Sequence, residues 1–229
     1  MWEENISGFL NYHTVYVFDS LGDAGKSIQN VPLNNLEDTL SYIEDVMGDL
    51  GLEKVHLVGH SFGGGVALNF GVKYPDRIQT VTLLDPAFTL NYPKMSALIG
   101  GTLSTLPFLP EKIQTWGTSQ LTGESTENIT GEEPLALMIK SAMKDYSTQI
   151  PSPKVIKEEE LKKISFPVYV AVAEKSPIAG QVAFENSAYI PKVTRKLYPE
   201  TTHSLPMEIA DELAKDLNGF WMEHDQPNQ

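Results

Sequence analysis

The chain of 229 residues contains no cysteine, and this absence limits the chemistry that it can perform. Without thiols there are no disulfides, no thiolate nucleophile and no zinc site built on cysteine. Basic residues are few as well, because 17 Lys and Arg stand against 30 Asp and Glu, which gives a net charge of −13. So acidic a surface repels phosphate backbones and anionic lipids, which argues against binding to nucleic acids or membrane surfaces.

Long hydrophobic runs are also missing, since no apolar segment approaches the roughly 20 residues that span a bilayer. The acidic residues 1–5 lack the positive start and apolar core of a signal peptide. A hydrophobic share of 41% with 21% charged residues is typical of a globular domain rather than a disordered chain. We therefore expect a soluble, cytoplasmic protein. The oligomeric state stays open.

Short apolar runs alternate with longer amphipathic stretches along the chain. The apolar runs predict five strands, at His13–Asp19, Lys54–Gly59, Thr80–Asp85, Pro167–Ala173 and Val193–Tyr198. Apolar residues at helical spacing predict helices at about 36–50 (capped by Asn34 or Asn35), at 61–73, around 180–189 and at about 207–221. Strands rich in Val and Leu that alternate with helices predict an α/β fold with a mostly parallel sheet covered on both faces.

The segment from Ala87 to about Ile164 interrupts this alternation. It shows no clear strand and contains one good helical pattern, Pro134–Tyr146. Because it follows the C-terminal end of a strand, where α/β proteins place their active sites, we interpret residues 87–164 as a helical lid between core segments 1–86 and 165–229. A structural elaboration is the alternative. Six apolar residues suit either a substrate pocket or packing of the lid on the core: Leu98, Ile99, Leu103, Leu106, Phe108 and Leu109.

The clearest functional signal is Gly59-His60-Ser61-Phe62-Gly63, a G-x-S-x-G sequence between a predicted strand and a predicted helix. A serine on such a tight turn is held in a strained conformation, and the two glycines leave room around it. The helix N-terminus directs the Phe62 N–H and the helix dipole toward the place where negative charge develops in acyl transfer. An anion-binding turn or a plain tight turn is the alternative.

With these features the chain resembles the α/β-hydrolase fold superfamily, in its lid-bearing, esterase-like branch. The resemblance covers nearly the whole chain, including the loop with Asp19, Gly22, Gly25 and Ser27, the turn at Ser61, Tyr74-Pro75-Asp76-Arg77, Leu83-Leu84-Asp85-Pro86, the lid and a late histidine. It implies a triad of serine, acid and histidine that acts by acyl transfer without a cofactor. The sequence shows no metal-binding motif.

A serine hydroxyl needs an adjacent base, and five histidines are available. His203 follows the last predicted strand and precedes the last helix, where the superfamily keeps its base. His60 lies inside the turn and is interpreted as structural. His13 and His56 lie on or next to strands, and His224 is placed in a polar tail. A loop histidine without a catalytic role is the alternative for His203.

The acid departs from the pattern of the superfamily. Its usual carboxylate follows the strand before the last one, and at that position this chain has Ser176. A second arrangement, found in members that resemble haloalkane dehalogenases, takes the acid from the end of the strand after the nucleophile's helix. Asp85 occupies that position, although an Asp before Pro also suits the start of a plain loop. Glu174 is the third choice.

The resemblance implies a further difference at the N-terminus. Relatives place three strands and a His-Gly-type loop before the region that begins here, and one of those strands lies between the strands predicted at His13–Asp19 and Lys54–Gly59. The loop supplies the second oxyanion N–H, and the loss of one such donor costs on the order of 10²–10³ in rate. Either the start is set too far downstream or a shortened form repacks.

The expected function is a serine hydrolase that cleaves a carboxylic ester, or a similar acyl bond, of a small apolar substrate through an acyl-enzyme. Ser61 is the expected nucleophile, His203 the base and Asp85 the acid, while the Phe62 N–H is the remaining oxyanion donor. The alternative is a catalytically impaired relative that binds a ligand or a partner without turnover.

Overall fold

A parallel four-stranded sheet forms the centre of the protein. The computed structural model describes residues 2–106, 108–127, 129, 137–138, 141–142, 145–146 and 148–225. The strands lie in the order β1 (Val55–His60), β2 (Ile78–Leu84), β3 (Val168–Ala173) and β4 (Val193–Tyr198), and every neighbouring pair is parallel. These strands match four of the five predicted runs, and the predicted α/β fold with a parallel sheet is confirmed.

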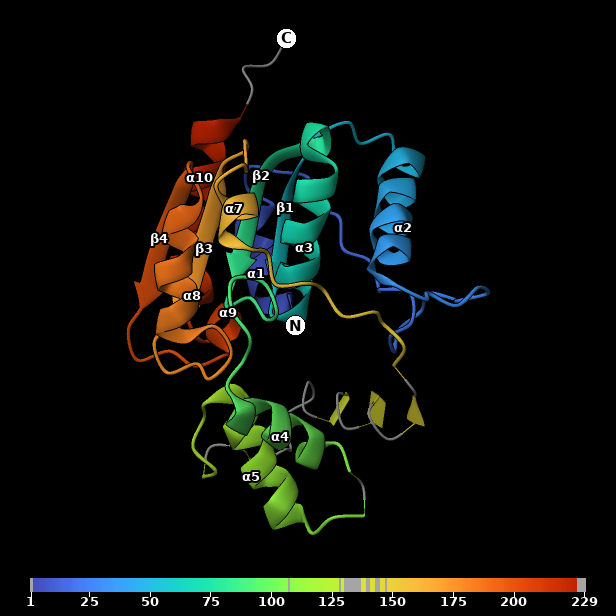
Figure 1. The fold of residues 1–229 in the computed structure, drawn as a ribbon, viewed down its shortest axis with the longest axis vertical. Coiled ribbons are helices and arrows are strands. Elements are labelled where there is room, and N and C mark those ends of the chain that lie inside the picture. The colour runs from blue at the N-terminus through green and yellow to red at the C-terminus, as the bar shows by residue number, and fades with distance from the viewer. Residues whose placement is uncertain are drawn as a thin grey trace.

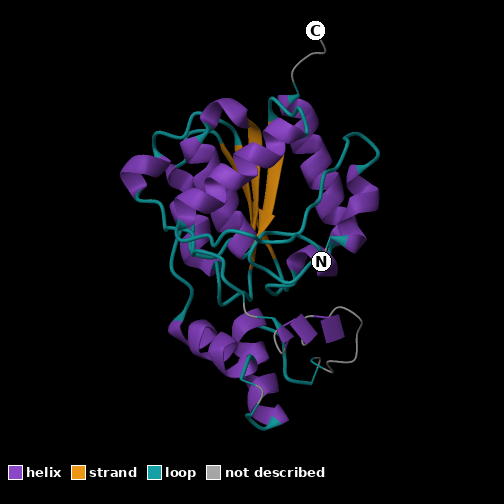
Figure 2. Cartoon of the chain, turned by 90° about the vertical axis from the view of Figure 1, so that its right-hand side faces the viewer, coloured by secondary structure: helices purple, strands orange, loops and turns teal. Residues whose placement is uncertain are grey.

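Helices cover both faces of the sheet (Figures 1 and 2). One face carries α2 (Leu36–Asp49), α3 (Phe62–Lys73), α7 (Glu158–Leu161) and α8 (Gly180–Asn186), which share one hydrophobic core with the strands. The other face carries α1 (Glu3–Phe9) and α10 (Ala210–His224), which share a second core. Short 3-10 turns lie at Pro75–Arg77 and Ser187–Tyr189. Burial on both faces explains why β3 is continuously apolar, whereas β2 also buries Thr80 and Thr82.

Two predicted helices differ in detail from the observed ones. The side chain of Asn35, rather than Asn34, caps α2 by accepting the Asp38 N–H at 3.1 Å. The predicted final helix is divided at Ile209 into α9 (Leu205–Glu208) and α10, because Ile209 has φ −132° and ψ 39° instead of helical angles. His224 is the last residue of α10 and not part of a polar tail.

The strand predicted at His13–Asp19 is wrong. The segment pairs with no strand among the described residues, and the side chains of Tyr16, Val17 and Phe18 are exposed. In the described sheet β1 is an edge strand. A β-rich sequence becomes a strand only where a neighbour supplies hydrogen-bond partners, and here none lies beside it.

Between β2 and β3 the chain leaves the sheet and forms α4 (Met95–Ser104) and α5 (Glu111–Thr122), which lie beyond the carboxyl ends of the strands (Figure 1). The described part of 87–164 contains no strand, as predicted, while the helix predicted at Pro134–Tyr146 lies mostly outside the described residues. None of the six apolar residues predicted for a pocket or for packing belongs to the buried core, and Ile99 and Phe108 are exposed. Among the described helices, none has the length and apolar character needed to cross a bilayer.

Helices α4 and α5 approach closely because glycines face each other where they cross. A Cβ atom on Gly117 would lie 2.6 Å from the carbonyl oxygen of Gly100, and a Cβ on Gly100 would lie 2.6 Å from that of Gly117. The backbones therefore touch directly, and any larger side chain at either position would push the two helices apart.

We expect Gly117→Ala to loosen this helix pair. The added methyl group overlaps backbone atoms of α4, and such overpacking costs about 1–3 kcal/mol. The control is Gly219→Ala in α10, where nothing lies within 4 Å of the new atom and where a stabilisation of about 0.5–1 kcal/mol is expected. Hydrogen exchange in α4 and α5 is the measurement. Unchanged exchange in the Gly117 variant would show that the helices do not pack in this way.

Candidate active site

Ser61 occupies a strained turn between β1 and α3. Its backbone has φ 53° and ψ −122°, a region that non-glycine residues enter only where surrounding structure holds them. The Ser61 N–H donates to the Leu84 carbonyl at 3.0 Å, and the Ala87 N–H donates to the Ser61 carbonyl at 2.9 Å. The turn is therefore clamped to the end of β2, and the side chain of Ser61 stays partly exposed.

The two glycines of the G-x-S-x-G sequence differ in their steric role. A Cβ atom on Gly59 would lie 2.2 Å from the Gly63 carbonyl oxygen, so the turn requires glycine at 59. A Cβ atom on Gly63 would have nothing within 4 Å, so the prediction that this position needs glycine for space is wrong. A Cβ atom on Gly65 would lie 2.6 Å from the side chain of Pro153, so this position also requires glycine. Phe62 is the first residue of α3, and its N–H has no acceptor within the helix.

The pairing of β1 with β2 brings Asp85 beside Ser61. His60 lies opposite Leu84 in the parallel register, so the next residue of each strand leaves the sheet at the same edge. Asp85 is completely buried and has φ 42°, a second strained residue at this edge. One carboxylate oxygen, Oδ1, accepts the Ala173 N–H at 3.1 Å.

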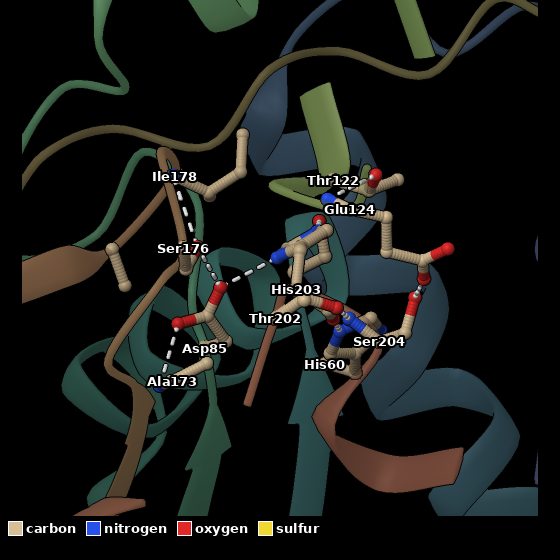
Figure 3. A network of polar contacts seen from close by, with 12 residues as sticks. His60, Asp85, Thr122, Glu124, Ala173, Ser176, Ile178, Thr202, His203 and Ser204 are labelled. Atoms are coloured by element: carbon tan, nitrogen blue, oxygen red, sulfur yellow. Dashed lines mark hydrogen bonds and ion pairs between the residues drawn. The ribbon is translucent and has the colours of Figure 1, made fainter. Parts of the chain in front are cut away.

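His203 joins these two residues. Its Nε2 lies 2.8 Å from Ser61 Oγ. Its Nδ1 lies 2.5 Å from Asp85 Oδ2, a contact that Figure 3 shows. A carboxylate can only accept, so Nδ1–H donates to Asp85 and Nε2 faces the serine hydroxyl as an acceptor. The structure thus brings together the three residues predicted as nucleophile, base and acid, in the geometry that activates a serine.

Ser176 supports the carboxylate of Asp85. Its hydroxyl donates to Asp85 Oδ2 at 2.5 Å and accepts the Ile178 N–H at 3.0 Å (Figure 3). The residue that stands where the superfamily pattern expects an acid therefore donates a hydrogen bond to the carboxylate of Asp85. No signal in the sequence indicated this role of Ser176 as a donor.

Glu174, the third choice for the acid, lies away from the site. Its side chain is exposed, and Oε2 accepts the Glu200 N–H at 2.9 Å. Residues 174 and 175 form the turn after β3, so Glu174 and Ser176 do not share one face as two residues of a strand at that spacing would. The geometry therefore favours Asp85 over Glu174.

The backbone of His203 is held on both sides. Its N–H donates to the Thr122 carbonyl at the end of α5 at 2.8 Å, and its carbonyl accepts Nε2–H of His60 at 2.8 Å. The next residue, Ser204, donates to Glu124 Oε1 at 2.7 Å. The end of α5 thus contacts the loop that carries the base (Figure 3).

The environment of His60 keeps this ring neutral. Burial, with a smaller contribution from the neighbouring His203 ring 4.8 Å away between centroids, lowers the pKa of His60 to about 4. A neutral ring with its proton on Nε2 is the form that donates to the His203 carbonyl. This agrees with the prediction that His60 is structural.

Among the described residues one group of histidine and carboxylate side chains is close enough to share a metal ion: His13, His56 and Asp225. His56 is the second residue of β1, whereas Ser61 follows its last residue. The group therefore lies at the opposite end of the sheet from the nucleophile.

The fold can be compared with those of known proteins. A family model described as the alpha/beta hydrolase fold matches residues 1–108, just under half of the chain. Together with the superposition given below, this shows that the chain has the α/β-hydrolase fold.

Individual relatives are bacterial carboxylesterases. Carboxylesterase YbfK of Bacillus subtilis (strain 168) is 27% identical over 219 residues, which cover 91% of this chain and 71% of the relative. The uncharacterized carboxylesterase nap of the same organism is 35% identical over 89 residues, but these cover only 39% of this chain and 30% of the relative. The crystal structure of naproxen esterase from Bacillus subtilis superposes with a TM-score of 0.82 at 22% identity, over 96% of this chain and 78% of that one.

The low pKa of His60 predicts a pH-dependent loss of stability. The unfolded chain binds a proton near pH 6.5 that the folded chain takes up only near pH 4, so the free energy of unfolding falls as the pH drops through this window. His60→Gln keeps a donor for the His203 carbonyl but does not titrate. We expect its stability to fall less steeply between pH 6.5 and 4, by up to about 1.4 kcal/mol per pH unit. Urea unfolding at several pH values is the measurement, and equal slopes in both proteins would contradict the assignment.

Proposed function

We propose that this protein is a serine hydrolase that cleaves the carboxylic ester, or a similar acyl bond, of a small apolar substrate. The observation that carries the proposal is the continuous chain of contacts from Ser61 Oγ through the His203 ring to the Asp85 carboxylate, with distances of 2.8 and 2.5 Å. The strained backbone of Ser61, at the start of a helix, supports it further. Similarity to carboxylesterases supports a hydrolase with esterase-like function.

In the proposed reaction Ser61 Oγ attacks the acyl carbon while Nε2 of His203 takes its proton. The Phe62 N–H, at the positive end of α3, donates to the oxyanion of the tetrahedral intermediate. His203 then gives its proton to the leaving alcohol, and the acyl group stays on Ser61. Water, activated by the same nitrogen, attacks the acyl-enzyme and restores the serine. No cofactor takes part in these steps.

The proposed role of Asp85 is to orient and stabilise His203. Its carboxylate keeps the proton on Nδ1, so that Nε2 faces the nucleophile, and it balances the positive charge that the ring acquires. Helices α4 and α5 are proposed as the lid, because the end of α5 contacts the loop of the base through the Thr122 carbonyl and Glu124. The exposed apolar side chains of α4 suit an apolar acyl or alcohol group.

A fluorophosphonate probe tests the nucleophile directly. We expect one covalent adduct per chain in the intact mass of the purified protein, because the probe reacts with an activated serine. Ser61→Ala is expected to remove the adduct and His203→Ala to slow its formation, while both variants stay folded by circular dichroism. Folded protein without an adduct would favour the alternative, a relative that binds a ligand without turnover.

Two carboxylates offer a matched comparison for the acid. We expect Asp85→Asn to lower kcat by about 10⁴ toward a short-chain p-nitrophenyl ester, because an amide in this place favours the wrong tautomer of the base. Glu174→Gln, two residues before Ser176 and exposed, is expected to leave kcat unchanged. The opposite result would identify Glu174, and not Asp85, as the acid.

A further inference from the structure

Three side chains that are far apart in the sequence meet at the amino end of the sheet. His13 follows α1, His56 belongs to β1, and Asp225 follows α10. Each offers one ligand atom, and the three atoms lie within 4.8 Å of one another. The positions 13, 56 and 225 form no spacing motif, which is why the sequence indicated no metal site.

The measured separations fit a common metal ligand set. Asp225 Oδ1 lies 2.9 Å from His56 Nε2 and 3.5 Å from His13 Nε2. Two ligands at about 2.0–2.1 Å from a tetrahedral zinc ion are roughly 3.3 Å apart, a value between these two distances. With all three atoms within 4.8 Å of one another, the side chains lie close enough to be directed at one ion.

His13 is the group that points to a missing ligand. Both of its ring nitrogens are inaccessible to solvent and make no hydrogen bond within the described structure. The 3.5 Å approach to Asp225 counts as an ion pair only if the ring is protonated. The ring is held edge-on against Trp221 and His56, with centroids 5.5 and 5.3 Å away. A buried polar nitrogen without a partner is costly, and a bound cation removes that cost.

His56 has the orientation that metal-binding histidines need. The β1–β2 pairing shifts between Val55 and His56, so that His56 lies opposite Thr80 instead of Gln79. This irregularity brings Nδ1 to 2.8 Å from the hydroxyl of the buried Thr80. A ligating histidine usually gives its other ring N–H to such an acceptor, which leaves Nε2 for the metal.

We propose that His13, His56 and Asp225 form a binding site for a divalent transition metal ion such as Zn²⁺. Two imidazoles and one carboxylate are a donor set that such ions prefer over Mg²⁺ or Ca²⁺. The side chain of Asp225 is 45% exposed, so water completes the coordination and the ion enters from solvent. The net charge of −13 raises the local concentration of cations.

The site has a structural role. It joins the segment after α1, the start of β1 and the end of α10, three elements that also pack around Trp221. It lies at the end of the sheet opposite Ser61, so the ion does not take part in acyl transfer. The inference is therefore independent of the proposed hydrolase activity.

Calorimetric titration with ZnCl₂ tests the site. Protein without an affinity tag is first treated with EDTA and dialysed. We expect one Zn²⁺ per chain and a higher thermal midpoint with the ion bound. His13→Gln, His56→Gln and Asp225→Asn are each expected to weaken binding at least tenfold, since the loss of even a supporting partner costs about 10–100-fold. Co²⁺ in place of Zn²⁺ gives a visible spectrum that reports coordination without any assay of activity.

The neighbouring histidine supplies the matched control. His224→Gln changes the residue next to Asp225 but no proposed ligand, and its affinity is expected to equal that of the unchanged protein. Asp225→Asn lies at the exposed end of α10, so it keeps the test decisive if His56→Gln fails to fold. Absence of stoichiometric binding to folded protein, or equal affinity in Asp225→Asn, would overturn the proposal and leave a plain ion pair between His56 and Asp225.

Discussion

The carboxylate of Asp85 is the group on which the arrangement of the site depends. It is fully buried, and an uncompensated charge in that position would cost several kcal/mol. Three donors compensate it: the Ala173 N–H at the end of β3, the Ser176 hydroxyl in the turn that follows, and Nδ1–H of His203 after β4. Because they come from separate segments, the need to satisfy one carboxylate fixes these segments relative to β2. The position of the base follows from this constraint.

Parallel pairing explains why residues so distant in sequence share one site. All four strands run in the same direction, so the segments that carry Ser61, Asp85, Ser176 and His203 leave the sheet at one edge. Neighbouring strands are about 4.8 Å apart, which is why an acid can come from the end of β2 while a polar residue after β3 contacts it. In the superfamily pattern the acid follows β3. In this chain the carboxylate of Asp85 follows β2, and the supporting hydroxyl of Ser176 follows β3.

The same direction of the strands separates the two candidate sites of this protein. The amino ends of the strands collect His56 and the residues packed beside it, while the carboxyl ends collect the strained residues Ser61 and Asp85. Strained backbone is concentrated at the end where chemistry is proposed, where rigid positioning matters most. At the amino ends, the partners of His56 are His13 and Asp225, which come from chain segments outside the sheet. This arrangement suits a role in holding those segments in place.

Features that depend on neighbouring residues could be predicted from the sequence. Apolar periodicity predicted β1 to β4 and α2, the G-x-S-x-G sequence predicted the turn at Ser61, and chain order pointed to His203. Features that depend on contacts between distant segments could be seen only in the folded chain. The β-rich segment His13–Asp19 is not a strand, because no neighbouring strand supplies its hydrogen-bond partners. The direction of the side chains, which spacing does not reveal, distinguishes Asp85 from Glu174. The fold also brings together His13, His56 and Asp225, which are far apart in the sequence. Local preferences are encoded residue by residue, whereas the partners of a buried polar atom are chosen by the fold.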